Sequence, residues 1–402
     1  MTKNLRSNLV EKFICVADKC ADTCCKHWSM QVDAVTYEKY KTSAPELLDA
    51  VEIDGGGTLQ NPHVGFCDYS FIMRKDAQTG YCVKFSDGKC GIQLEKGEGY
   101  LGDACALYPR ITRKLGDALV MTATMSCPEI ARIALYDEQP FIFVNAEFAR
   151  LPQEIKNILP DEISADDALA VHNLFIAATQ DEAASIEQIF ARIASVSRSL
   201  QLLPKKDWAN AAPMYFRLAD GRLPVPEKNI NDPFNLLHSL CGLLVASKKS
   251  VPPRLAQTIA DMENALGVKL DWENVLINTS DGSLQKYENI YAAWQNNFAK
   301  KCDALMKKWL AAQLSSALFP FAGLGETLPE RVTIIGVRLA IFRLALMSSY
   351  SISDIELHQD DVVRIVQSLS RFLEHLADPA FSLQIYAETG WNKEARMRGL
   401  LV

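Results

Sequence analysis

The stretch Cys15–Trp28, which reads CVADKCADTCCKHW, decides how the first third of this chain folds. It carries four cysteines, and nine of the chain's eleven cysteines lie before residue 128. Thiolates bind zinc and iron-sulfur clusters, and several must converge on one point to do so. The sequence therefore predicts a metal-binding module. The thiols expected to serve as its ligands are Cys20, Cys24, Cys25, Cys82, Cys90, Cys105 and Cys127.

Disulfides are the first alternative for these cysteines, and inert buried thiols are the second. Disulfides would require an oxidising compartment. The first ten residues, MTKNLRSNLV, show neither the continuous apolar core nor the small-residue cleavage site of a secretory leader. The adjacent pair Cys24 and Cys25 also fits a simple disulfide framework awkwardly. We therefore expect a reducing, intracellular setting and metal ligation.

The metal itself is left open by the spacing of these residues. The cysteines mix local and distant positions, and distant segments can meet to supply the four thiolates that an iron-sulfur cluster needs. Structural zinc also accepts four thiolates, so it stays the alternative to the cluster that we favour. His27 could replace a thiolate, although we expect it to pack or to form hydrogen bonds.

Composition indicates a globular protein with more than one domain. The chain has 402 residues, of which 49% are hydrophobic and 23% charged, and its net charge is -7. This charge argues against a dominant nucleic-acid surface, because phosphate contacts need clustered Lys and Arg. The apolar run 332–347 contains Arg338 and Arg343, which would be costly in a bilayer, so it predicts a packed helix and no membrane span.

The predicted fold is mainly α, with a loop-rich cysteine module at residues 1–150 followed by a helical domain at 151–402. Glycine-containing turns punctuate short apolar pieces in the first part, whereas apolar residues recur at helical intervals in the second. Ser353-Asp354-Ile355-Glu356 resembles a local helix start. The segments expected to be helical are 166–203, 284–318, 331–350 and 352–376.

Two motifs are set aside. Gly97-Glu98-Gly99-Tyr100-Leu101-Gly102 matches the dinucleotide-binding fingerprint, but no long helix is expected to follow it, so we predict a loop. Cys20, Cys24 and His27 have the spacing of the radical adenosylmethionine loop with histidine in place of its third cysteine. The sequence does not indicate that radical chemistry.

Five separated blocks of sequence together resemble a known family. The chain resembles the cysteine-rich CxxCxxCC metal-chelating proteins and, more closely, the flagellin lysine N-methylases of the FliB type. The spacing on either side of Cys20 is looser than the CxxCxxCC pattern, which leaves the ligands there open. The blocks are Phe13–Trp28, the tyrosines Tyr37 and Tyr40 with Thr36, Cys82–Gln93, Cys105–Arg110 and Ser126–Glu129, and Tyr287–Tyr291 is the most suggestive piece further on.

The resemblance implies a bacterial cytoplasmic enzyme that transfers a methyl group from S-adenosylmethionine to lysine ε-amino groups of flagellin. It also implies a 4Fe-4S cluster, in agreement with the number of thiols. The oligomeric state cannot be read from the sequence. A non-catalytic zinc- or cluster-binding adaptor and a redox-sensing protein are the alternatives.

Methyl transfer to lysine requires a neutral amine, although a free lysine has a pKa near 10.4 and is protonated at neutral pH. The residues expected to accept the proton or to position the amine are Asp22, Tyr108 and Glu129, which adjoin cysteines. Aromatic faces suit the sulfonium of the donor, and an arginine can bind its carboxylate with two parallel hydrogen bonds. The residues expected to contact the donor are Trp28, Tyr37 and Arg110, with ordinary packing, turn or ion-pair roles as the alternative for all six.

Overall fold

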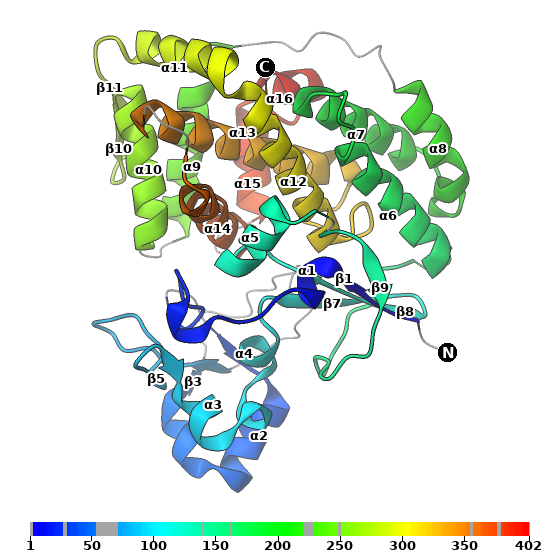
Figure 1. Cartoon of the computed structure of the whole chain (residues 1–402), viewed down its shortest axis with the longest axis vertical. Coiled ribbons are helices and arrows are strands. Elements are labelled where there is room, and N and C mark those ends of the chain that lie inside the picture. Colours follow the sequence, from blue (N-terminus) through cyan, green and yellow to red (C-terminus); the bar gives the residue numbers. More distant parts are fainter. Residues whose placement is uncertain are drawn as a thin grey trace. The chain divides into compact units, whose positions relative to one another are not determined.

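The computed structural model describes residues 3–26, 30–53, 71–138, 140–160, 162–219, 229–247, 251–353, 357–375 and 379–401. Two compact units make up the chain, Met1–Ile158 and Leu159–Val402. Figure 1 shows short strands and helices in the first unit and long helices in the second. The fold is mainly α, as predicted from the sequence.

The first unit contains a four-stranded sheet, which the sequence did not predict. In this sheet β1 pairs in parallel with β8 and antiparallel with β9, while β7 and β8 form an antiparallel hairpin. Gly116, with a φ of 62°, makes the turn of that hairpin, a backbone conformation that glycine adopts at little cost. The order is β7-β8-β1-β9, with bounds Lys3–Ser7 (β1), Arg110–Leu115 (β7), Ala118–Ala123 (β8) and Phe143–Asn145 (β9).

The remaining elements of the first unit are short. A three-stranded sheet has the order β2-β4-β3, and β5 and β6 form a small hairpin. The strands are Gln31–Val32 (β2), Val51–Ile53 (β3), Phe71–Met73 (β4), Phe85–Ser86 (β5) and Lys89–Cys90 (β6). The helices are Asn8–Glu11 (α1), Ala34–Ser43 (α2), Gly91–Lys96 (α3), Asp103–Leu107 (α4) and Pro128–Tyr136 (α5), with 3-10 turns at Ala17–Lys19, Pro45–Ala50 and Glu98–Tyr100.

The glycine motif at residues 97–102 lies in a loop, as predicted. Gly97 ends α3 with a φ of 85°, and the 3-10 turn Glu98–Tyr100 follows it. The next helix, α4, has only five residues. A dinucleotide-binding turn would instead open a long helix.

A small apolar cluster, which we call the lower core, holds α2, β2, β4 and α4 together. Tyr40 is fully buried in it, and its hydroxyl donates a hydrogen bond to the carbonyl oxygen of Tyr100 at 2.6 Å. Cys24, Cys82, Cys90 and Cys105 pack against its edge. The buried members of the lower core are Met30, Val32, Tyr40, Ala44, Leu47, Ala50, Met73, Ile92, Leu101 and Ala104.

The second unit is a bundle of long helices around α13 (Leu328–Ser353). This helix contacts α7, α9, α10, α11, α12, α14, α15 and α16. It is long and apolar enough to cross a membrane, yet it is buried inside the unit along its apolar length, as predicted for 332–347. A helix that is apolar on all sides belongs in a core of this kind.

The other elements of this unit agree with the helical prediction in type but not in every boundary. They are α6 (Ala165–Thr179), α7 (Ile186–Gln201), α8 (Trp208–Leu218), α9 (Asp232–Ala246), α10 (Pro253–Leu266), α11 (Ser283–Asn297), α12 (Ala299–Ala317), α14 (Gln359–His375), α15 (Pro379–Glu388) and α16 (Glu394–Gly399), a 3-10 turn at Lys205–Asp207, and the hairpin strands β10 (Val268–Asp271) and β11 (Leu276–Thr279).

Two predicted helical segments are each divided. Segment 166–203 was wrong as one helix, because Ser185 forms a capping box with Gln188 and starts α7 anew. Segment 284–318 is divided at Phe298, where α11 ends and α12 begins. Segment 352–376 was wrong at its start, because Ile352 and Ser353 end α13 and α14 begins at Gln359. Most of the predicted helix start at 353–356 lies outside the described residues.

Candidate functional site

Four thiols from separate segments of the first unit lie close together, and we call them the first thiol group: Cys25, Cys82, Cys90 and Cys105. The backbone N–H of Cys82 donates a hydrogen bond to the carbonyl oxygen of Cys25 at 2.8 Å, which ties the two segments together. Cys90 ends the β5–β6 hairpin, and Cys105 lies in the middle of α4. Three of the four thiols pack on the lower core.

The electrostatics of the first thiol group support this proximity. Burial, together with negative charge on Cys25 and Cys90, raises the pKa of Cys82 to about 11. Burial and the charges of Cys25, Cys82 and Cys90 likewise raise the pKa of Cys105. Because such charge effects decline with distance, the four sulfur atoms share one neighbourhood. A cationic centre would be needed to hold them all as thiolates.

The donor set of this group fits a metal centre. Four sulfur ligands are typical of iron-sulfur clusters and of structural zinc. Within the described ranges, no three His, Cys, Asp or Glu side chains are arranged to hold a single metal ion. The group thus offers four sulfur ligands of the kind that both of these centres use.

A second thiol group consists of Cys15, Cys20 and Cys127. Burial raises the pKa of Cys127 to about 12, and negative charge on Cys20 and Cys15 adds to the effect. The Sγ of Cys20 donates a hydrogen bond to the carbonyl oxygen of Asp22 at 3.3 Å. Of the other predicted ligands, Cys20 and Cys127 thus belong to this second group, and Cys24 packs on the lower core.

Disulfides do not link the cysteines that the structure describes to one another. Cys67 and His27 lie outside the described residues. The two thiols of the helical unit, Cys241 and Cys302, are fully buried in its core.

The predicted catalytic carboxylates lie beside the second thiol group. Besides burial, the charges of Cys15, Asp22 and Glu129 raise the pKa of Cys20, which places both carboxylates within electrostatic reach of its sulfur. Glu129 also pairs with Arg132 at 3.6 Å along α5. Asp22 and Glu129 thus both act on the same thiol.

Tyr108 and Arg110 extend this neighbourhood. The hydroxyl of Tyr108 shares a hydrogen bond of 3.2 Å with Ser126, the residue before Cys127. The guanidinium of Arg110 lies 5.1 Å from the ring centroid of Phe13. Burial lowers the pKa of Arg110, against the opposing effect of the nearby charges on Glu98, Cys15 and Cys127.

A structural role for Arg110 would require a carboxylate partner, but the nearby candidates Asp103 and Glu129 pair with other arginines. Asp103 pairs with Arg150 at 3.0 Å, and Glu129 pairs with Arg132. Asp103 also accepts a hydrogen bond from the backbone of Gln153, whose side chain donates to Asp33. This buried network fixes the start of α4 and thereby the position of Cys105.

Of the two predicted donor-binding aromatics, the structure describes Tyr37. The ring of Tyr37 stacks on Phe71 with 3.8 Å between centroids, and the Nζ of Lys41 lies 5.0 Å from its ring. Tyr37 also packs on the lower core. Trp28 lies outside the described residues.

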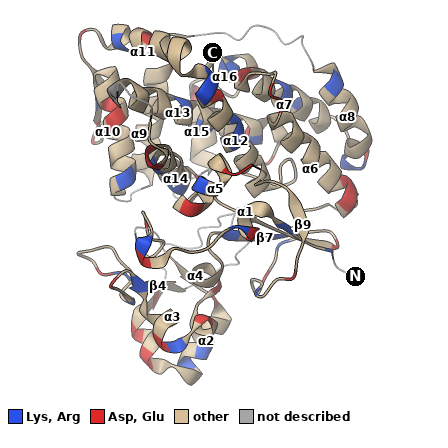
Figure 2. Cartoon of the chain, viewed as in Figure 1, with Lys and Arg blue, Asp and Glu red and all other residues tan. Residues whose placement is uncertain are grey.

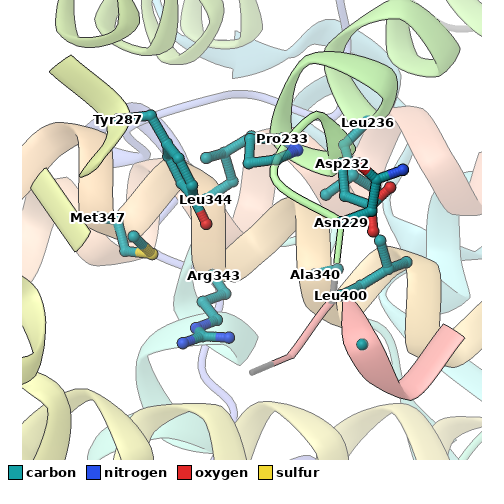
Figure 3. Close-up of a pocket in the computed structure, with 11 residues that line it drawn as sticks. Asn229, Asp232, Pro233, Leu236, Tyr287, Ala340, Arg343, Leu344, Met347 and Leu400 are labelled. Carbon is teal, nitrogen blue, oxygen red and sulfur yellow. The ribbon is translucent and has the colours of Figure 1, made fainter. Parts of the chain in front are cut away.

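A pocket in the helical unit involves residues that the sequence reasoning did not single out as a site (Figure 3). Tyr287, Arg343 and Met347 lie on one side of it, and Asp232, Asn229 and Leu400 lie on the other. They come from α9, α11, α13 and the end of the chain, so sequence distance concealed them. Arg343 was noted only as a charge inside an apolar helix, and Tyr287 only as part of the suggestive 287–291 piece.

Charges are scattered over the described elements of both units (Figure 2). Lys and Arg segments and Asp and Glu segments both occur on helices of each unit in this view.

Comparison with known proteins places the chain in a family. Residues 161–397 match the model of the FliB lysine N-methylase C-terminal domain, which is more than half of the chain. No solved structure matches the chain significantly.

Curated relatives match a shorter part. The flagellar biosynthetic protein FliU of Salmonella muenchen is 25% identical over 131 residues, which cover 32% of this chain and 74% of FliU. The lysine-N-methylase of Salmonella typhimurium is 25% identical over 131 residues, which are 32% of this chain but only 31% of that enzyme. The similarity to the FliB type that the sequence blocks indicated is confirmed: the chain belongs to the FliB lysine N-methylase family.

Proposed function

We propose that this protein transfers methyl groups from S-adenosylmethionine to lysine ε-amino groups of flagellin in the bacterial cytoplasm. The match of residues 161–397 to the FliB lysine N-methylase domain is the observation that carries this proposal. The flagellar name of the FliU relative supports flagellin as the substrate. The whole activity is a proposal because the aligned segment spans less than a third of the lysine-N-methylase relatives.

The reaction sets a clear chemical requirement. The lysine nitrogen must lose its proton, after which its lone pair attacks the methyl carbon of the sulfonium. The bond between that carbon and sulfur breaks, and its electron pair stays on sulfur as a neutral thioether. We propose that Asp22 or Glu129 accepts the proton, because the two carboxylates lie together beside Cys20. Tyr108 is the proposed positioning group, through its contact with Ser126.

We also propose that residues 1–150 form the cluster module and that residues 151–402 bind the substrates. Within the module, Cys25, Cys82, Cys90 and Cys105 would hold a 4Fe-4S cluster, with zinc as the alternative. When bound, such a cluster supplies a covalent cross-link between distant segments and a redox-active centre. Trp28, Tyr37 and Arg110 stay the sequence-based candidates for donor contact, although Phe71 already covers one face of Tyr37.

The test is a methyl-transfer assay with protein purified without oxygen. Incubation with unmodified flagellin and methyl-labelled donor is expected to label flagellin lysines, as located by mass spectrometry of peptides. Glu129→Gln and Asp22→Asn should lower kcat by about 10²- to 10⁴-fold for whichever residue is the base. Glu52→Gln, at an exposed position of the same unit, is the matched control and should keep full activity.

Two outcomes would reject parts of the proposal. Flagellin that binds tightly but never acquires label would favour the adaptor function over the enzyme. Full activity in both carboxylate variants would remove Asp22 and Glu129 from the proton transfer while leaving the methylase intact.

A further inference from the structure

The pocket of Figure 3 combines two buried charges of opposite sign. Asp232 and Arg343 are each 4% exposed, and both line the pocket. The Oδ2 of Asp232 and the Nε of Arg343 have no hydrogen-bond partner among the described residues. Burying a charged group without full hydrogen bonding is costly, so two such groups in one pocket point to a ligand that completes them.

Each charge has a different local setting. Asp232 is the first residue of α9, and its Oδ1 accepts a hydrogen bond from Arg396 at 2.5 Å, so only Oδ2 is left to bind a ligand. Arg343 lies on the central helix α13, and its guanidinium is 5.8 Å from the ring centroid of Tyr291. No carboxylate pairs with Arg343 in the described part of the chain.

Tyr287 connects the two charges. Figure 3 shows its hydroxyl end directed toward the side where Arg343 lies. Burial raises the pKa of Tyr287, the positive charge of Arg343 opposes that rise, and the negative charge of Asp232 adds to it. The charges of Asp232 and Arg343 therefore both reach the hydroxyl of Tyr287.

The size of the pocket limits what can enter it. The pocket leaves about 20 Å³ in which the centre of a water-sized group can move. It can therefore receive the polar end of a ligand but not a whole nucleoside. Leu344 and Met347 offer apolar contact to the part that follows.

We propose that this pocket binds the α-amino-acid end of the methyl donor, with the ammonium on Asp232 and the carboxylate on Arg343, which takes the role that the sequence suggested for Arg110. A zwitterion matches both charges at once, whereas a lysine side chain of the protein substrate would bring a second cation toward Arg343. Flagellin lysines have no free α-carboxylate within the chain, so the charge pair distinguishes donor from substrate. The inference rests on the proposed function, because it assumes a donor with an amino-acid end.

The test measures binding by calorimetry with the full chain, purified without oxygen. Arg343→Met should weaken binding of S-adenosylmethionine by about 10- to 100-fold, the range expected for losing hydrogen bonds to a charged group. The same variant should bind decarboxylated S-adenosylmethionine as the wild type does, since that ligand lacks the carboxylate. Asp232→Asn should weaken both ligands.

Two controls separate binding from folding. Arg338→Met removes another buried guanidinium of α13, one that donates a hydrogen bond to the carbonyl oxygen of Leu373 and does not line the pocket. This control should bind the donor as the wild type does. Circular dichroism of Arg343→Met should show an intact helical unit, because replacing a buried unpaired charge by an apolar side chain removes a desolvation cost.

The outcomes distinguish the pocket from the enzyme function. Donor binding and methyl transfer at wild-type levels in both Arg343→Met and Asp232→Asn would overturn the pocket and leave the methylase standing. Variants that lose affinity for flagellin but keep it for the donor would overturn the pocket in favour of a substrate site. A wild-type protein that binds neither donor nor its decarboxylated form would overturn both proposals.

Discussion

The two units of this chain are stabilised in different ways. The helical unit has a continuous apolar core around α13, which eight other helices contact. The first unit has short elements, the small lower core, a buried polar network around Asp33 and Asp103, and two groups of thiols. Small cores contribute limited free energy, and metal binding commonly makes up the difference. The helical unit can thus be stable through its own apolar core, whereas we expect the stability of the first unit to depend on a metal bound by its thiols.

We expect removal of the proposed metal to change the stability of the two units most unequally. A chelator added to protein that was purified without oxygen should abolish the protection of the first unit against amide hydrogen exchange. The reason is that the segments around Cys25, Cys82, Cys90 and Cys105 would no longer be joined by the metal. Protection in the helical unit should be unchanged. Loss of protection in both units together would show that they are not stabilised separately.

Overpacking of the helical core comes next in size. A Cβ at Gly336 on α13 would meet the Sδ of Met397 and lie 2.7 Å from the Cζ of Phe190. Gly336→Ala should therefore lower the free energy of unfolding of the helical unit by about 3 kcal/mol, as measured with urea. The metal content should stay the same.

Gly242→Ala is the matched control for that substitution. A Cβ at Gly242 on α9 would lie 3.6 Å from Ile385 and Val275, which is ordinary contact. The change should be neutral or stabilise the helix by about 0.5–1 kcal/mol. Equal losses in the two variants would mean that core packing does not explain the first.

Acid should weaken the helical unit through His172. Burial lowers the pKa of His172 to about 4, although a hydrogen bond of 2.8 Å with the carbonyl oxygen of Phe319 opposes this. The unfolded chain, with an ordinary pKa near 6.5, then takes up the proton first, so stability falls as pH drops from about 6.5 toward 4.

The size of this effect follows from the two pKa values. Between pH 8 and pH 5, His172 should lower the free energy of unfolding of the wild type by about 2 kcal/mol. His172→Asn lacks this contribution, so its loss over the same range should be smaller by about 2 kcal/mol. Identical pH dependence in the two proteins, measured by urea unfolding of the helical unit, would contradict the buried neutral state of His172.

Periodicity predicted the helical unit well because its signal is local. The apolar run around Arg338 and Arg343 gave α13, whereas Ser185 divided a segment that looked continuous. The hairpin of β7 and β8 was missed, although the Gly116 turn lies between them: β8 is apolar (ALVMTA), but β7 (RITRKL) carries three charged residues. Strands of two to six residues are too short to show a clear alternation of apolar and polar residues, so the sequence did not predict them.

The candidate sites were harder to predict than the helices. Cysteine count predicted a thiol site, but only the fold brings Cys25 together with Cys82, Cys90 and Cys105, and Cys15 together with Cys20 and Cys127. The pocket was missed because Asp232, Tyr287 and Arg343 come from three helices. Residues far apart in sequence carry no local signal of their meeting.

The most direct test is iron and sulfide analysis of the wild-type protein, purified without oxygen, beside two cysteine variants. The wild type should contain about four irons and about four inorganic sulfides per chain. Cys82→Ser should lose most of both, whereas Cys302→Ala, a buried thiol of the helical unit, should keep them. A wild type without iron, or a Cys82→Ser variant with its full iron content, would contradict the first thiol group as the site of the cluster.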